Sequence, residues 1–228
     1  MSRADSSPDA AAAPTPARQR RKAARPQELL DAALELFVEK GFAATRTEEV
    51  AARAGVSKGT LYLYYPSKED LLKAVILRNI SGEIAEGMDI VRGWSEGTPE
   101  LLAFVLHEWW RRFGETRASG ICKLMMSEAR NFPEIASFFA DEVIKPMHGL
   151  LRTVIERGVE RGEFRAVPMP QTVQLLTAPM LYLVMNKHSF GACEGVDLGI
   201  DPRRVIDAHV ELTMQGMLPR PATAGPRP

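Results

Sequence analysis

Residues 58–64 place hydroxyl groups and a cation within about two turns of a predicted helix, a combination that can contact nucleic-acid phosphates and base edges. The segment reads Lys-Gly-Thr-Leu-Tyr-Leu-Tyr. Lys68 adds a second cation at the predicted start of the next helix, where exposed backbone amides also favour a phosphate. Tyr62 and Tyr64 are expected to face outward, whereas Tyr65 is expected to pack in an aromatic cluster.

Two short helices joined by a tight turn are predicted over residues 47–65, and they would position these side chains. Thr47 is suited to capping the first helix, Gly55 supplies the turn, and Pro66 prevents the second helix from continuing. Small and apolar residues stand where the two helices must touch: Val50, Ala51, Ala54, Val56, Leu61 and Tyr65. These residue types at this spacing are typical of a helix-turn-helix, which presents its second helix to the major groove.

From Pro26 onward, apolar residues recur at intervals of three and four, which predicts an all-α chain. Pro26 is suited to the first position of a helix that ends before Gly41, and residues 67–80 are expected to form the fourth helix. Later helices are expected at about 98–117, 121–130, 133–162, 170–190 and 202–217. The sequence shows no strand-like alternation bounded by turn residues.

The first 25 residues differ in composition from the rest of the chain. They are rich in Ala, Pro and Ser, contain no aromatic residue, and carry six cations against two carboxylates. We therefore expect residues 1–25 to be a disordered basic arm. The cations gather beside the first helix, so the arm either contacts phosphates or a minor groove, or is a solubilising leader. The early Asp5 and Asp9 argue against an organelle transit peptide.

Residues 26–75 closely resemble the N-terminal domain of TetR/AcrR-family transcriptional regulators, and the string GVSKGTLYLYYPSKEDLL is the most specific part of the match. The rest of the chain resembles the family in length and helix pattern. The resemblance implies a homodimer in which each subunit has a three-helix DNA-binding head. It also implies a larger helical domain that binds a small-molecule effector and dimerises through its last two helices.

Carried over residue by residue, the resemblance implies two groups of DNA-contacting side chains. The phosphates would be contacted by Thr47, Thr60, Tyr62 and Lys68. The bases would be faced by Lys58, Gly59, Leu63 and Tyr64. Position 64 is a departure, because many relatives carry histidine there, and a tyrosine replaces that hydrogen-bonded readout by a phosphate contact or by stacking.

The large domain is rich in bulky apolar side chains, most of which are expected to form its core. The adjacent Trp109 and Trp110 cannot share one helical face, so one of them is expected to face a cavity or an interface. Together with the resemblance, this predicts a pocket for a lipophilic effector, with the candidate lining residues Trp109, Trp110, Phe113 and Met125.

Two apolar stripes are candidates for the dimer interface, although packing within one subunit must claim part of each. The first stripe is Val173, Leu176, Met180, Leu183 and Val184. The second is Val205, Ala208, Leu212 and Met217. The chain then divides into a basic arm (1–25), a DNA-binding domain (26–72, with its motif at about 46–65), a ligand-binding and dimerisation domain (73–217) and a disordered tail (218–228).

No constellation typical of catalysis or of a metal centre appears in the sequence. His107-Glu108 opens like a zinc-protease motif, but position 111 is arginine, so the second ligand is missing. The other three histidines are isolated, and Cys122 and Cys193 have no metal-ligand spacing. We therefore expect no catalytic residue, no cofactor and no metal.

Composition and local patterns favour the cytoplasm. The chain has no apolar signal core and no apolar run of the ~20 residues that a membrane span needs, and its two cysteines fit a reducing compartment. The 29 basic and 29 acidic residues cancel, so any attraction to nucleic acid must come from local charge.

Taken together, the sequence predicts a homodimeric regulator that binds double-stranded operator DNA. We expect it to be a repressor that a lipophilic effector of unknown identity releases from the operator. The alternative is a helical small-molecule-binding protein or enzyme that has lost DNA binding.

Overall fold

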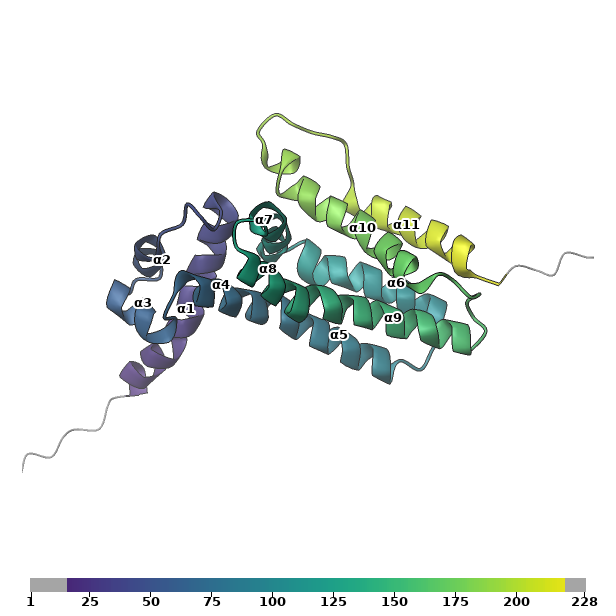
Figure 1. Cartoon of the computed structure of the whole chain (residues 1–228), viewed down its shortest axis with the longest axis horizontal. Coiled ribbons are helices and arrows are strands. Elements are labelled where there is room, and N and C mark those ends of the chain that lie inside the picture. Colours follow the sequence, from purple (N-terminus) through teal and green to yellow (C-terminus); the bar gives the residue numbers. More distant parts are fainter. Residues whose placement is uncertain (1–15, 220–228) are drawn as a thin grey trace, which may run out of the picture.

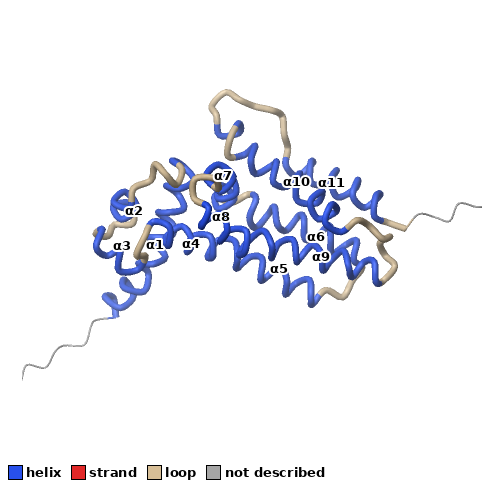
Figure 2. Tube along the Cα trace, viewed as in Figure 1, coloured by secondary structure: helices blue, strands red, loops and turns tan. Residues whose placement is uncertain are grey.

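The computed structural model describes residues 16–219, and every regular element within that range is a helix (Figure 2). A small head lies at one end of an elongated molecule, and a larger helical body forms the rest (Figure 1). The prediction of an all-α fold is confirmed. None of the helices in the described range is both long and apolar enough to cross a bilayer.

The head consists of α1 (Pro16–Lys40), α2 (Thr47–Arg53), α3 (Lys58–Tyr64) and the first turns of α4 (Lys68–Ile76). Its core forms because α1 presents an apolar stripe to the two short helices. The turn between α2 and α3 is made by Gly55, whose φ of 66° suits a residue without a side chain. The fully buried side chains that hold these helices together include Leu29, Ala33, Phe37, Val50 and Leu61.

Serine caps begin both α3 and α4. The Ser57 hydroxyl accepts a hydrogen bond from the backbone N–H of Thr60 at 3.1 Å, and the Ser67 hydroxyl accepts one from Asp70 at 2.9 Å. Each cap satisfies a backbone donor that has no partner inside its helix, which fixes where the helix begins. Both α3 and α4 are therefore anchored at their N-terminal ends.

The first helix begins earlier than the sequence indicates. α1 starts at Pro16, so the predictions that residues 16–25 are disordered and that Pro26 opens the helix are wrong. Residues 17–25 consist of alanine, arginine, glutamine and lysine, which all have high helix propensity, and the helix continues through Pro26 although proline removes one backbone hydrogen bond. The remaining residues of the predicted arm (1–15) and most of the predicted tail (220–228) lie outside the described range.

A continuous helical path connects the head to the body. α4 passes through a π-helical turn, η1 (Leu77–Ser81), into α5 (Gly82–Gly93). The body is completed by α6 (Thr98–Trp109), η2 (Trp110–Gly114), η3 (Arg117–Ser119), α7 (Gly120–Glu128), α8 (Pro133–Phe139), η4 (Ala140–Ile144), α9 (Lys145–Glu160), α10 (Met169–Lys187), η5 (Phe190–Ala192) and α11 (Pro202–Met217). Within the described range, η1, η2 and η4 are π-helical turns and η3 and η5 are short 3₁₀ turns.

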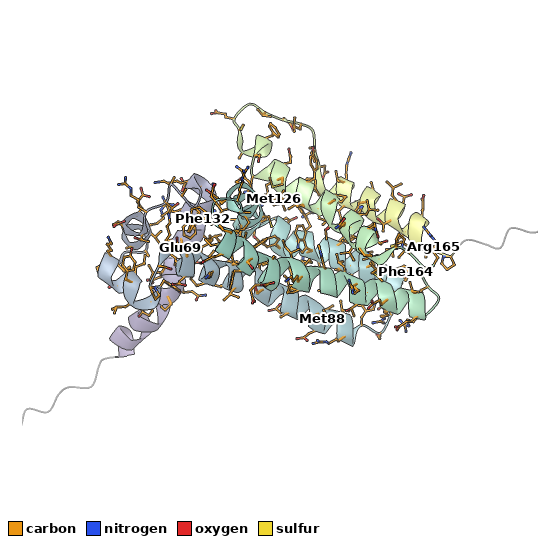
Figure 3. The ribbon with its side chains drawn as sticks, in the orientation of Figure 1. Glu69, Met88, Met126, Phe132, Phe164 and Arg165 are labelled. Carbon is orange, nitrogen blue, oxygen red and sulfur yellow. The ribbon has the colours of Figure 1, made fainter. Side chains whose placement is uncertain are left out.

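Head and body share a packed junction. The ring of Phe42, in the loop after α1, meets the edge of Phe132 with ring centroids 4.8 Å apart, and Figure 3 shows Phe132 where the two parts of the molecule meet. The Arg78 guanidinium reaches back to Asp31 on α1 at 3.1 Å. The same core cluster includes residues of the head and of α7 and α8, so the head packs directly against these two helices.

The apolar stripe of α10 is buried inside the subunit. Val173, Leu176, Met180, Leu183 and Val184 pack with residues of α6, α9 and α11 and are at most 4% exposed. Of the two expectations for this stripe, packing within the subunit is the one the structure supports, because residues of α6, α9 and α11 share its core cluster and leave it no exposed face for a second subunit. The large apolar side chains that α10 and α11 expose are instead Leu175, Tyr182 and Leu212.

Candidate functional site

The predicted DNA-contacting residues of α2 and α3 meet through a pair of hydroxyl groups. The Tyr62 and Thr47 hydroxyls are hydrogen-bonded at 3.0 Å, although Thr47 begins α2 and Tyr62 lies in the middle of α3. Thr47 is buried at 7% exposure, and Tyr62 remains 39% exposed. The buried threonine therefore orients the phenol, while the tyrosine keeps an outward surface.

A cation and a carboxylate face each other beside this pair. The Lys58 ammonium forms an ion pair with Glu48, and both side chains are about half exposed. The hydrogen bond between them raises the pKa of Lys58 and lowers the pKa of Glu48. The ammonium also lies 5.7 Å from the centre of the Tyr62 ring. Glu48 is a contributor that sequence reasoning missed, because only the crossing of α2 and α3 brings it next to Lys58.

The outer face of α3 combines a small, an apolar and several polar residues. Leu63 is 83% exposed, so its side chain contributes little to the core of the head. A methyl group at Gly59 would meet only the Ser57 hydroxyl oxygen, at 3.8 Å, within the described range, so glycine is not needed there for packing. Thr60 hydrogen-bonds the Ser57 hydroxyl at 2.9 Å, and Tyr64 packs partly against the head core.

Lys68 is held by the loop that follows α1. Its ammonium donates to the backbone carbonyls of Phe42 at 2.8 Å, Ala43 at 3.4 Å and Thr45 at 3.1 Å. It also lies 4.4 Å from the centre of the Phe42 ring. An ammonium has three N–H donors, and all of them have acceptors here. The side chain thus fixes the loop leading to α2, and the predicted phosphate contact has to compete with these three carbonyls.

An apolar cavity in two adjoining lobes lies within the body. The larger lobe has a volume of about 230 Å³ and the smaller about 60 Å³. Helices that are distant in sequence enclose the cavity. Residues of η1, α5, α6 and α9 line it, and residues of α7 and α10 close the larger lobe. Both lobes are lined by Ile80, Val105, Trp109, Phe113 and Met147.

All three π-helical turns of the described range contribute to this cavity. η1 supplies Ile80, η2 supplies Phe113, and η4 supplies Val143 and Ile144. A π-turn inserts a residue into a helix and re-aims the side chains around it, and such turns occur frequently at functional sites. Their shared location supports a functional role for the cavity.

Charged side chains border the smaller lobe and form a network of ion pairs with an excess of one carboxylate. The Arg112 guanidinium contacts Glu86 and Glu108 at 2.7 Å and Glu83 at 3.4 Å. Hydrogen bonding to Arg111, and secondly to Arg112, lowers the pKa of Glu108 to about 2. Three carboxylates and two guanidinium groups therefore leave no unpaired cation at this end.

The candidate effector residues separate into two groups. Trp109 and Phe113 line both lobes. Trp110 and Met125 are buried in the core at 5% and 4% exposure and do not border either lobe. Two other residues of α7, Cys122 and Met126, line the larger lobe instead, and Figure 3 labels Met126 at α7.

The structure provides no obvious centre for a metal in the described range. No group of three or more His, Cys, Asp or Glu residues there is arranged to hold an ion. Burial raises the pKa of the Cys122 thiol to about 12, so this thiol stays protonated and acts as an apolar wall of the cavity.

Comparison with known proteins identifies the class. Residues 29–75 match the model of bacterial regulatory proteins of the tetR family, and residues 101–190 match the tetracyclin repressor-like C-terminal domain. The two matches coincide with the head and with most of the body. The chain belongs to the TetR family of transcriptional regulators, and it is a DNA-binding protein of that class.

The individual relatives that match more than half of the chain have low sequence identity to it. The fatty acid metabolism regulator protein of Bacillus subtilis is 25% identical over 138 residues, which are 60% of this chain and 70% of the relative. The transcriptional repressor KstR2 of Rhodococcus jostii is 28% identical over 153 residues, or 64% and 70% of the two chains. The structure of FadR from Bacillus subtilis in complex with stearoyl-CoA superposes with a TM-score of 0.62 at 19% identity, over 83% of this chain and 98% of that one, which shows a shared fold.

Proposed function

We propose that the protein is a cytoplasmic repressor that binds operator DNA through the outer face of α3 and the start of α2. The observation that carries this proposal is the almost fully exposed Leu63 on a helix that is anchored by its cap and by Leu61. An apolar side chain in that position gains contacts when it meets a thymine methyl group in the major groove. The protein acts in this proposal by binding alone.

The remaining contacts follow from the geometry of the motif. Tyr62 and Thr60 offer hydroxyl groups to phosphates, while Lys58, Gly59 and Tyr64 face the bases beside Leu63. Packing within the head does not require a glycine at position 59. In this proposal Gly59 instead allows the backbone of α3 to approach the duplex closely, because it has no side chain. Lys68 acts in this proposal through the loop carbonyls that it binds, and so sets the position of Thr47.

The operator would be read by two heads, because we propose that α10 and α11 pair with the same helices of a second copy. Leu175 is 70% exposed, Tyr182 56% and Leu212 69%. These side chains gather on adjoining helices, and a two-fold interface uses the same patch on both subunits. A dimer of this kind places two copies of α3 at half-sites separated by about one helical turn of DNA or a multiple of it.

A lipophilic effector in the cavity would release the DNA. One helical path carries Lys68 at the head and Ile80 at the cavity wall, about 18 Å apart at the usual rise per residue. A ligand that favours one packing of η1 against α6 and α9 therefore also favours one position of the head. Its effect is limited by its difference in affinity for the two states, typically about 1–3 kcal/mol. The relative named as a fatty acid metabolism regulator and the stearoyl-CoA complex support a ligand with an alkyl chain.

The reciprocity of this coupling provides the test. Trp109 lines both lobes, so its fluorescence reports ligand entry, and the anisotropy of labelled operator duplex reports release. We expect an alkyl ligand to weaken DNA binding, and operator to weaken ligand binding by the same factor. A ligand that binds equally well with and without operator would contradict the proposed coupling.

A further inference from the structure

The apolar cavity adjoins a basic hollow on the surface between α9 and α10. This hollow has a volume of about 390 Å³ and is lined by Lys145, His148, Gly149, Arg152, Pro170, Val173 and Gln174. His148 lines both this hollow and the larger lobe of the cavity. One turn further along α10, Leu176 and Thr177 belong to that lobe. The hollow and the cavity are thus neighbouring parts of one groove between two helices.

The lining of the hollow contains two cations and no carboxylate. Lys145 is paired with Asp141 at 2.5 Å. Arg152 is exposed and makes no ion pair or side-chain hydrogen bond with any residue in the range 16–219. A guanidinium binds carboxylate and phosphate groups through paired N–H donors. Arg152 is therefore available to an anion placed at the outer end of the groove.

The other end of the cavity does not suit an anion. Arg112 is surrounded there by Glu83, Glu86 and Glu108, so the local charge is negative even with Arg111 included. A ligand with one charged end and one apolar end would consequently enter with its anionic group toward α9 and α10. Its apolar chain would lie beside Trp109 and Met147.

We propose that the effector is an anionic amphiphile, whose alkyl chain fills the cavity and whose carboxylate or phosphate group lies in the basic hollow near Arg152 and His148. This inference rests on the proposed function of the cavity as an effector site. It adds the chemical class of the effector and the residues that recognise its head group.

Gly149 offers a sharp way to change the charge of the hollow without disturbing the fold. A methyl group at this position meets no atom of the described structure within 4 Å, and replacing glycine inside a helix favours the helix. The Gly149→Glu variant adds a carboxylate where the head group would lie, and Gly149→Gln adds the same bulk without charge. Arg152→Gln removes the free cation while keeping a polar side chain.

The test uses four probes with the same alkyl chain: dodecanoate, dodecyl phosphate, dodecanol and dodecyltrimethylammonium, each titrated into the full chain while tryptophan fluorescence is recorded. We expect both anions to bind more tightly than the alcohol, with an affinity that falls as salt is added. Arg152→Gln and Gly149→Glu should each weaken anion binding about five- to tenfold, as expected for one charge pair at a partly exposed site. Gly149→Gln adds the same bulk at the hollow without the charge, so it should weaken anion binding less than Gly149→Glu does, and the difference between the two variants isolates the effect of the charge.

The outcomes separate the two proposals. Equal binding of the alcohol and the anions, with no effect of Arg152→Gln or Gly149→Glu, would overturn the head-group site and leave the apolar cavity intact. Preferential binding of the ammonium probe would overturn the assigned sign of the charge. Failure of all four probes to bind would overturn the effector cavity itself, and the head-group site with it. A preference between dodecanoate and dodecyl phosphate would identify which anionic group the hollow recognises.

Discussion

The hydroxyl groups of Thr47 and Tyr62 lie 3.0 Å apart and join the start of α2 to the middle of α3. Fifteen positions separate the two residues in the chain, and the turn at Gly55 brings them together. The buried threonine thereby fixes the direction in which the tyrosine points. A surface that reads DNA benefits from this constraint, because side chains held in place before binding lose less entropy on binding.

Replacing Tyr62 by phenylalanine removes one hydroxyl and leaves the ring in place. We expect the affinity for operator DNA to fall about two- to tenfold, the size of one hydrogen bond of about 0.5–1.5 kcal/mol. The slope of affinity against salt should stay constant, because no cation is lost. Fluorescence anisotropy at several salt concentrations measures both quantities. Ser127→Ala, which removes an exposed hydroxyl on α7 outside the head and outside the proposed dimer interface, is the control and should bind as the wild type does.

Lys68 should contribute to stability through the three carbonyls that it binds. Hydrogen bonds to a charged group contribute about 1.5–3 kcal/mol, so Lys68→Met should lower the free energy of unfolding by about that amount. Lys40→Met removes an exposed ion pair with Glu49 and should change the free energy of unfolding by about 1 kcal/mol or less. Urea denaturation of both variants measures the difference. Full stability of Lys68→Met together with lost DNA binding would instead assign Lys68 to a phosphate contact.

His188 should make stability depend on pH. Burial, and secondly the nearby Lys187 and Lys123, lower its pKa to about 4, and its Nε2 lies 2.8 Å from the Ser119 hydroxyl oxygen. Between pH 6.5 and about 4 the unfolded chain binds a proton that the folded chain does not. The stability present above pH 6.5 is therefore lost as the pH falls through this window.

The variant His188→Gln isolates this contribution. Urea denaturation at pH 7.5 and at pH 5.5, which is above the range where most carboxylates titrate, should show a smaller decrease in the free energy of unfolding for the variant than for the wild type. Equal decreases in the two proteins would show that other groups cause the pH dependence.

Leu212 tests the dimer. It is 69% exposed on α11, so Leu212→Glu should leave the subunit folded while placing two like charges near each other in a two-fold interface. We expect light scattering after gel filtration to show a dimer for the wild type and a monomer for the variant. Leu77→Glu, at an exposed leucine outside α10 and α11, should remain dimeric. A monomeric wild type, or a dimeric Leu212→Glu, would argue against this interface.

Local signals predicted the head well. Gly55, Ser57, Ser67 and the apolar spacing around Val50 each act through neighbours in the chain, and the structure uses them as turn, caps and core. The same reasoning placed the start of α1 at Pro26, because proline is favoured at the first helical position, and gave too little weight to the helix formers before it.

Contacts between distant segments could not be predicted in this way. The α10 stripe has the periodicity of a buried face, but periodicity does not distinguish a partner subunit from α6 and α9 of the same chain. Adjacency indicated that Trp109 and Trp110 point in different directions, and the three-dimensional packing decided that Trp109 borders the cavity. The acceptors of Lys68 belong to a loop more than twenty residues earlier in the chain, which no local pattern reveals.

The central claim is that the exposed face of α3 reads DNA, and selection from a library of duplexes tests it most directly. Wild-type protein, Leu63→Glu and Leu218→Glu are each used to enrich random duplexes, which are then sequenced. Leu63 and Leu218 are both exposed, so neither substitution should unfold the chain. We predict that the wild type and Leu218→Glu enrich the same sequence with two related half-sites, and that Leu63→Glu enriches none, because a carboxylate at the groove meets phosphate charge. Enrichment of the same sequence by Leu63→Glu, or of no sequence by the wild type, would contradict the claim.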